Sequence, residues 1–450
     1  MKQADLIIIG AGPGGYETAV KAAEAGLDTV IIEARRPGGT CLNEGCIPTK
    51  CLCRNADLLY DLRDAATFGV ENLSYTFDMR KAIERKNQVV STLVGGIETL
   101  LHHPHITYVN GRAEFAPGDA HTVRVGSEDY TAPHIIIATG SVSKFLPIEG
   151  AHLPGVLTST EMLDLDHVPA RICIIGGGVI GLEFASIFNA FGSQVTVVEF
   201  CKEILPNFDT DIAKRLRQAL KGHGITFVTQ AAAKAIREND GGSYSVEYDC
   251  KGKPSTIEAD TVLMAVGRAA NLDSLNLSEA GVEFDRRGIV TDEHFATNIP
   301  GVYAVGDING KCQLAHAATF QSLHVLNGIL GREDGIRLDI IPAAVFTSPE
   351  AAMVGLTEQQ CKENGMEYTV HKGFFRANGK AMAMNETEGM VKLIAGADDR
   401  VIGCHLFGPH AADLIQEITV LMQKNGTTAD LRDCIHAHPT LGEVLMNAVG

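Results

Sequence analysis

The sequence uses one strand–loop–helix–strand unit twice, and this repeat constrains the fold more than any other feature. In the first copy, an apolar run from Asp5 to Gly10 leads into GAGPGG and a helical stretch, and a second apolar run ends at Glu33. The second copy runs from Arg171 through GGGVIG to Glu199. In both copies the acidic residue follows the first glycine of the loop by 23 positions. Such units predict parallel sheets with helices on their faces.

The glycines of these two loops suit the binding of a dinucleotide. The first glycine makes the turn, the second lets the backbone approach a pyrophosphate, and the third lets the helix pack on the strand. The helix amino terminus offers free N–H groups to the phosphates, and the acid accepts from a ribose hydroxyl. A single loop of this kind is also typical of an ordinary tight turn. Because strand, helix and acid recur together, we predict two dinucleotide sites, at Gly10, Gly12, Gly15 and Glu33 and at Gly176, Gly178, Gly181 and Glu199.

Three further apolar segments end in glycine turns, as expected at the carboxyl edge of a parallel sheet. They lead into Thr139-Gly140, Gly267 and Gly306-Asp307. Asp307 is a candidate for holding a polyol hydroxyl of a cofactor, and a turn aspartate is the ordinary alternative. From Ile341 onward, β-rich segments precede helical stretches, which is the pattern of a separate α+β domain.

The fold class predicted is therefore α/β, with two Rossmann-like dinucleotide-binding domains plus a C-terminal α+β domain. We expect residues 1–145 to form the first part of the first nucleotide-binding domain, residues 146–270 the second, residues 271–338 a return to the first, and residues 339–450 the C-terminal domain.

Charge and hydropathy restrict the partners. The formal net charge of −17 argues against nucleic acid and anionic membrane surfaces. No apolar run approaches the roughly 20 residues of a membrane span, and the strand predicted from Asp5 leaves no room for a signal sequence. We therefore expect a cytoplasmic protein.

The segment GGTCLNEGCIPTK places Cys41 and Cys46 five positions apart, just after the first unit. A helix that starts at about Cys46 would bring its sulfur near free N–H groups, which stabilise a thiolate. Taken alone, such a pair is equally typical of core packing. No zinc-ligand spacing accompanies it, so no metal is expected. Cys51 and Cys53 on the same helix suit buried packing, with thiol exchange or metal binding as alternatives.

Near the end of the chain, HAHPTLGE places Glu443 five residues after His438. A histidine oriented by a carboxylate is the base, and then the acid, that thiol exchange needs at neutral pH. On its own the motif is more typical of a surface or capping histidine, and we assign His436 to that ordinary class.

Together these motifs resemble the class I pyridine nucleotide-disulfide oxidoreductases, and most closely the branch that oxidises dihydrolipoamide. The resemblance covers essentially the whole chain, including ATG from Ala138 to Gly140 and HPTLGE near the end. RANGKAMAMNETEG, from Arg376 to Gly389, is similar to a segment of the dimerisation domain of that branch.

The resemblance implies FAD at the first loop, NAD at the second, and an antiparallel homodimer. His438 and Glu443 of one subunit would complete the site that holds Cys41 and Cys46 of the other. Lys50 would lie against the flavin and pair with Glu183, and a cis proline would follow the histidine. The cofactor-binding residues implied beyond the two loops are Gly39, Thr40, Lys50, Thr139, Gly140, Gly306 and Asp307 for FAD and Gly267 for NAD.

The implied reaction starts when His438 deprotonates a dihydrolipoamide thiol, which exchanges with Cys41. Cys46 then passes electrons to FAD, and hydride moves on to NAD. The implied partners are the lipoyl-bearing components of a 2-oxoacid dehydrogenase or glycine-cleavage system. The coenzyme preference follows from Glu199, which would repel the 2′-phosphate of NADP, although Lys202 lies nearby.

Three features depart from the usual pattern of the family. Glu44 inserts a carboxylate between the two cysteines and would raise their thiol pKa if its side chain faced them. Ala270 stands where proline is usual, and the sequence ends seven residues after Glu443. Two other functions stay open: a reductase of glutathione or another small disulfide, and a non-catalytic flavoprotein.

Overall fold

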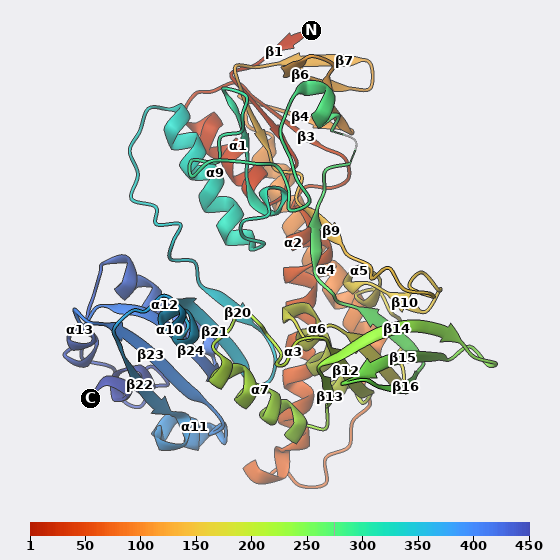
Figure 1. The fold of residues 1–450 in the computed structure, drawn as a ribbon, viewed down its shortest axis with the longest axis vertical. Helices are drawn as coiled ribbons and strands as arrows, with labels where there is room; N and C mark the ends of the chain where they lie inside the picture. The colour runs from red at the N-terminus through yellow and green to blue at the C-terminus, as the bar shows by residue number, and fades with distance from the viewer. Residues whose placement is uncertain (274) are drawn as a thin grey trace. The chain divides into compact units, whose positions relative to one another are not determined.

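The computed structural model describes residues 1–273 and 275–450, which form two compact units. Each unit is assembled from three stretches of chain, so residues far apart in sequence meet inside it (Figure 1). The first unit contains Met1–Cys51, Ile83–Lys144 and Gly267–Leu338, and the second contains Leu52–Ala82, Phe145–Val266 and Asp339–Gly450.

The first unit is built on a five-stranded parallel sheet. Strand β2 is LIII, with all four residues buried, as expected when helices cover both faces of a parallel sheet. Helices α1 and α9 lie side by side (Figure 1), joined by a 2.8 Å hydrogen bond from Thr18 Oγ1 to Ser322 Oγ. The strands, in spatial order, are β19 (Val302–Ala304), β8 (His134–Ile137), β2 (Leu6–Ile9), β3 (Thr29–Glu33) and β4 (Ile106–Asn110), and the helices are α1 (Pro13–Glu24) and α9 (Ala315–Ile329).

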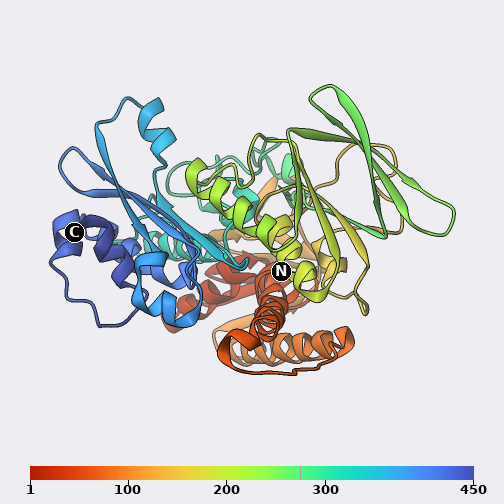
Figure 2. The ribbon, with the colours of Figure 1, turned by 90° about the horizontal axis from the view of Figure 1, so that it is seen from below.

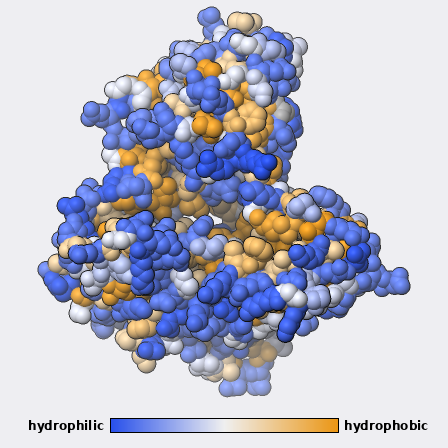
Figure 3. All heavy atoms as spheres, in the orientation of Figure 1, coloured by the Kyte–Doolittle hydropathy of each residue, from blue (hydrophilic) through white to orange (hydrophobic). Residues whose placement is uncertain are grey.

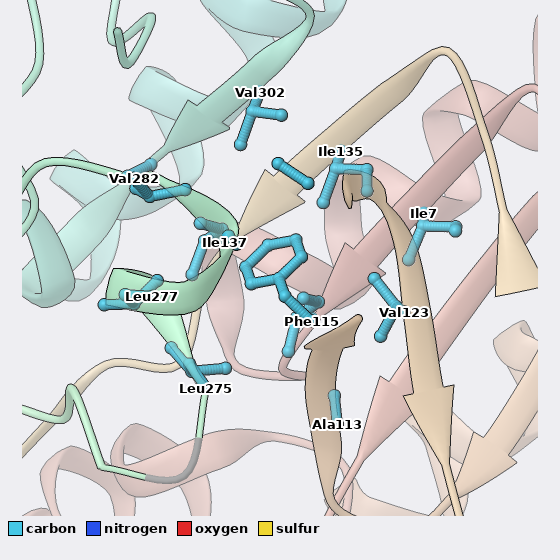
Figure 4. Close-up of a cluster of buried hydrophobic side chains, with 14 of the residues drawn as sticks. Ile7, Ala113, Phe115, Val123, Ile135, Ile137, Leu275, Leu277, Val282 and Val302 are labelled. Carbon is cyan, nitrogen blue, oxygen red and sulfur yellow. The ribbon is translucent and has the colours of Figure 1, made fainter. Parts of the chain in front are cut away.

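A second sheet of the first unit packs against the parallel sheet, and Phe115 lies in the core that they share. Figure 4 shows its ring among the side chains of Val123, Ile137 and Leu275, all of them buried. The strands of this sheet, in spatial order, are β1 (Lys2–Gln3), β7 (Glu128–Thr131), β6 (Asp119–Val125) and β5 (Ala113–Ala116). Other elements lying in or entering this unit are α2 (Gly39–Glu44), α3 (Cys46–Arg63), α4 (Met79–Leu101), β9 (Ser141–Ser143), β18 (Arg268–Ala270), α8 (Leu277–Ala280) and η2 (Gly306–Asn309).

The second unit contains another five-stranded parallel sheet and a three-stranded antiparallel sheet. Figure 2 shows the antiparallel sheet in green. The parallel strands, in spatial order, are β10 (Val156–Leu157), β17 (Thr261–Met264), β11 (Arg171–Ile175), β12 (Gln194–Glu199) and β13 (Thr226–Thr229). The antiparallel strands are β14 (Ala231–Glu238), β15 (Tyr244–Cys250) and β16 (Lys253–Ala259). The helices of this part are η1 (Ala65–Phe68), α5 (Ser159–Met162), α6 (Val179–Phe191) and α7 (Thr210–Gly222).

The C-terminal part of the second unit is an antiparallel sheet with helices. Its strands, in spatial order, are β20 (Ala343–Val345), β21 (Glu350–Gly355), β24 (Val401–Gly408), β23 (Met390–Gly396) and β22 (Tyr368–Phe374). Its helices are α10 (Glu358–Glu363), η3 (Phe375–Ala377), α11 (Gly379–Met384), α12 (Ala411–Gln423), α13 (Thr428–Arg432) and α14 (Glu443–Val449).

These sheets confirm the predicted α/β class with two Rossmann-like sheets and a C-terminal α+β part. On the face shown in Figure 3, hydrophilic residues cover most of the outer surface, in keeping with the net charge of −17. Within the described part of the chain, no helix combines the length and the hydropathy that crossing a membrane requires.

Candidate active site

The first glycine of each loop adopts a backbone conformation that other residues rarely take. The φ angle is +105° at Gly10 and +114° at Gly176. A side chain there would also collide with the carbonyl of the neighbouring strand end, Ala138 in the first loop and Ala265 in the second. Both turns therefore require glycine, as the sequence predicts.

The second and third glycines of each loop differ in the space around them. A β-carbon at Gly15 or Gly181 would collide with the carbonyl oxygen of the first glycine of its own loop. At Gly178, by contrast, a β-carbon would meet nothing within 4 Å, and at Gly12 the nearest atom is the Cα of Gly39, 3.8 Å away. Helices α1 and α6 begin just beyond these open positions, and no side chain caps either of them. Both helix ends therefore fit the pyrophosphate of a dinucleotide.

The two acids that end β3 and β12 hold their loops in the same way. Glu33 Oε2 accepts from the N–H of Ala11 at 2.8 Å, and Glu199 Oε2 accepts from the N–H of Gly177 at 2.5 Å. In each case the other carboxylate oxygen accepts from the amide two residues further along. The carboxylates thus lie beside the loops, where we predicted ribose contacts.

The cysteine pair lies against the first glycine loop. The N–H of Gly38, just before α2, donates to the carbonyl of Ala11 at 2.7 Å. Cys41 lies on α2, and Cys46 is the first residue of α3, which confirms the predicted helix start. Both are thiols in this structure. A hydrogen bond to Cys46, and then burial, raise the pKa of Cys41, and Lys50 opposes this only in part. The charge of Cys46 also contributes to the raised pKa of Cys41.

Glu44 does not act on the Cys41 thiol as its position in the sequence suggested. Its carboxylate faces Arg35, whose Nη1 and Nη2 lie 2.5 and 3.1 Å from the two oxygens. It is not among the groups that shift the pKa of Cys41. We expected Glu44 to raise the thiol pKa if its side chain faced the cysteines. Its carboxylate instead pairs with Arg35, so this expectation does not hold for Cys41.

The turns at the sheet edge meet in one polar network. Asp307 accepts from Ser141 Oγ at 2.5 Å, and Ser141 Oγ accepts from Arg268 Nε at 2.7 Å. The N–H of Asn271 donates to the carbonyl of Gly140 at 3.0 Å. Burial raises the pKa of the Asp307 carboxyl. Sequence reasoning missed Ser141 and Arg268, although both directly follow predicted glycines.

The other predicted residues of this edge also have defined contacts. The hydroxyl of Thr139 donates to the carbonyl of Asn271 at 3.2 Å. The N–H of Gly306 donates to the buried side chain of Gln321 at 2.8 Å, and the carbonyl of Gly267 accepts from the amide of Lys144 at 3.0 Å. These contacts fix the loops that follow β8, β17 and β19.

The predicted histidine and glutamate form a hydrogen-bonded pair. His438 Nδ1 lies 2.9 Å from Glu443 Oε1, and the other oxygen accepts from the N–H of Thr440 at 2.8 Å. The Thr440 amide and His438 hold the pKa of the Glu443 carboxyl below its ordinary value. The bond between His438 and Pro439 is cis, as predicted. The His438 side chain is 79% exposed, so its second nitrogen is accessible.

The candidate residues are divided between the two units. Cys41, Cys46 and Lys50 belong to the first, and Glu183, His438 and Glu443 belong to the second. Glu183 is buried and accepts from the N–H of Phe346 at 3.0 Å. The pairing of Lys50 with Glu183, and of the cysteines with His438, stays a prediction.

The remaining cysteines include Cys51 and Cys53, which are buried on α3 as expected. Five of the eleven cysteines are buried. Across residues 1–273 and 275–450, no cluster of three or more histidine, cysteine or acidic side chains has the arrangement of a metal site.

Two family models match the chain. Residues 4–322 match the pyridine nucleotide-disulphide oxidoreductase family, and residues 341–449 match the dimerisation domain of the same family. The chain therefore belongs to the pyridine nucleotide-disulphide oxidoreductases. It is an NAD-dependent flavin disulfide oxidoreductase, and its cofactors are FAD and NAD(H). The C-terminal match supports a homodimer.

Named relatives cover nearly the full length. The mitochondrial dihydrolipoyl dehydrogenase of Pisum sativum is 38% identical over 99% of this chain and 90% of its own, and that of Geobacillus stearothermophilus is 39% identical over 99% and 95%. Among solved structures, the Cu(II) complex of the HOCl-induced flavoprotein disulfide reductase RclA from Escherichia coli has a TM-score of 0.89 and 31% identity, over 100% of this chain and 99% of its own.

Proposed function

We propose that this chain oxidises dihydrolipoamide carried on a lipoyl-bearing protein and transfers the electrons to NAD+. The cysteine pair carries the proposal, because Cys41 is hydrogen-bonded to Cys46, its pKa is raised, and the helix that carries it begins against the first glycine loop. The relatives called dihydrolipoyl dehydrogenase, similar along almost the whole chain, support this choice of substrate.

The first half of the reaction is thiol–disulfide exchange at the Cys41–Cys46 disulfide. His438 takes the proton of a dihydrolipoamide thiol, and the thiolate attacks Cys41 while Cys46 leaves as a thiolate. The second substrate thiol then attacks the mixed disulfide, which closes lipoamide and frees Cys41. The substrate is oxidised and the pair is reduced, with one proton held by His438 and one by Cys41. The raised pKa of Cys41 favours this distribution.

The residues of the two loops would hold the cofactors. Gly12 and the start of α1 would receive the pyrophosphate of FAD, and Asp307 would bind a hydroxyl of its polyol. Gly178 and the start of α6 would receive NAD, with Glu199 near its ribose. Bound FAD supplies the electron transfer between the reduced pair and the nicotinamide.

The preference for NAD over NADP rests on Glu199. Its side chain is buried, and its carboxylate is fixed by the amides of Gly177 and Cys201. Because it cannot swing aside without losing both hydrogen bonds, it would oppose a 2′-phosphate. This counts against the second candidate function, the reduction of glutathione or other small disulfides with NADPH.

The test replaces Cys46 with serine. We expect Cys46→Ser to abolish dihydrolipoamide oxidation while the purified protein keeps its FAD absorbance, because serine replaces only the sulfur and leaves the residues of the cofactor loops unchanged. Cys250→Ser, in β15, is the matched control and should keep full activity. Unchanged turnover by Cys46→Ser would overturn the proposed mechanism.

A further inference from the structure

A second histidine–carboxylate contact lies two residues before the proposed base. His436 Nε2 is 2.7 Å from Glu417 Oε1 on α12, and its Nδ1 is 3.0 Å from the carbonyl oxygen of Cys434. The side chain of His436 is 8% exposed, against 79% for His438. Sequence reasoning placed His436 among the ordinary surface histidines, and this burial corrects that assignment.

The contacts of His436 favour one charge state. A backbone carbonyl and a carboxylate can only accept hydrogen bonds, so both contacts are hydrogen bonds only when both ring nitrogens carry protons. The contacts therefore favour the imidazolium form of His436. Burial lowers its pKa, but the Cys434 carbonyl and the Glu417 carboxylate outweigh burial and raise the pKa above the ordinary value.

The His436 ring also packs against the loop that carries the base. A β-carbon added at Gly442 would lie 3.6 Å from the His436 ring and 3.7 Å from Glu417 Oε2. Asn378 Nδ2 also contacts this loop, donating to the carbonyl of Thr440 at 3.0 Å. The loop is thus anchored by Asn378 and by His436.

We propose that His436 is a positioning residue, which as an imidazolium bound to Glu417 fixes the loop that presents His438. The proposal rests on the proposed function, in which His438 is the base. It assigns Glu417 a role as well, since this side chain holds the charge on His436.

The proposal predicts a dependence on pH. The charged groups that face His436 are Glu417 on α12 and Glu443 on α14, and both favour the imidazolium. A neutral imidazole has one donor, so one ring nitrogen would then direct a lone pair at an oxygen. Because the pKa of His436 in the folded chain is raised, the anchor is complete below the ordinary pKa and is lost as the pH rises through the raised value. Activity should therefore fall at high pH as the loop is released.

The test is the pH profile of kcat/KM for dihydrolipoamide in the FAD-loaded enzyme. Glu417→Gln keeps an oxygen that accepts from His436 but removes the charge. We expect the falling limb to move about one pH unit lower. Glu363→Gln removes one charge from α10 of the same domain and should leave the profile unchanged.

A second variant separates positioning from general damage. His436→Gln keeps a donor to Glu417 but no longer donates to the Cys434 carbonyl. We expect kcat to fall about tenfold and the falling limb to disappear, with the KM for NAD+ unchanged. A falling limb at the wild-type pH in both Glu417→Gln and His436→Gln would overturn the proposal.

His438→Ala distinguishes a wrong positioning role from a wrong base. If His438→Ala abolishes activity while Glu417→Gln and His436→Gln behave like wild type, His438 remains the base and the positioning role of His436 is wrong. If His438→Ala stays fully active, the proposed function of His438 is wrong.

Discussion

At the residue scale, the chemistry depends on side chains whose partners are distant in sequence. Cys41, Cys46, His438 and Glu443 could be identified from their motifs because each pair lies five positions apart. The role of His436 could not, since its partner Glu417 is 19 positions away on another element. The contacts of Ser141 with Arg268 and Asp307 span 127 and 166 positions, which no local pattern reports.

Replacing the third glycine of each loop with alanine tests which cofactor that loop binds. Gly15→Ala should prevent FAD binding, because the new atom collides with the carbonyl of Gly10 and must displace the loop from α1. Gly181→Ala should keep FAD but raise the KM for NAD+ at least tenfold, for the same reason in the second loop. Flavin absorbance and steady-state kinetics measure the two effects.

The matched control for both variants is Gly95→Ala, on α4. A β-carbon there would meet nothing within 4 Å, and alanine favours the helix, so both cofactors should bind normally. Full FAD content in Gly15→Ala would show that the first loop is not the flavin site.

At the scale of elements, the strands that carry glycine turns were predicted to within a few residues, because apolar runs and loop motifs define their ends. The sheet β1-β7-β6-β5, the sheet β14-β15-β16 and helix α4 were not predicted. In the first of these sheets, β1 pairs with a strand far along the chain, as when Lys2 pairs with Tyr130. Pairings of this kind are decided by tertiary packing rather than by local sequence.

A buried lysine joins two elements of the second unit. Lys392 on β23 is 2% exposed, and its Nζ lies 2.8 Å from Asp209 at the start of α7 and 2.7 Å from Glu358 on α10. Lys392→Met would leave the buried Asp209 without its cation, which should destabilise the fold by about 3–5 kcal/mol. The urea unfolding midpoint should fall clearly below that of Lys253→Met, an exposed control on β16. Equal midpoints for the two variants would contradict this account of the ion network.

At the scale of the whole molecule, family membership and the dimerisation domain support a homodimer, and the resemblance predicts that each active site draws on both subunits. One subunit would contribute Cys41 and Cys46, and the other His438 and Glu443. The residues of such a site can be identified from the sequence. Which subunit supplies each residue depends on how the dimer assembles.

Mixing two inactive variants tests the shared site. Cys46→Ser and His438→Ala are each expected to be inactive as homodimers. After joint refolding or co-expression, a dimer with one subunit of each kind would have one intact site, so about a quarter of wild-type activity should return. A mixture that stays inactive, with mixed dimers shown to form, would contradict the shared site.

The measurement that tests the central claim most directly is a comparison of substrates and coenzymes on the purified FAD-loaded protein. Lipoamide and oxidised glutathione are each assayed with NADH and with NADPH. The account predicts that lipoamide with NADH gives the highest kcat/KM by at least about a hundredfold, since Glu199 opposes the 2′-phosphate of NADPH. A higher kcat/KM for glutathione with NADPH would contradict both the substrate and the coenzyme.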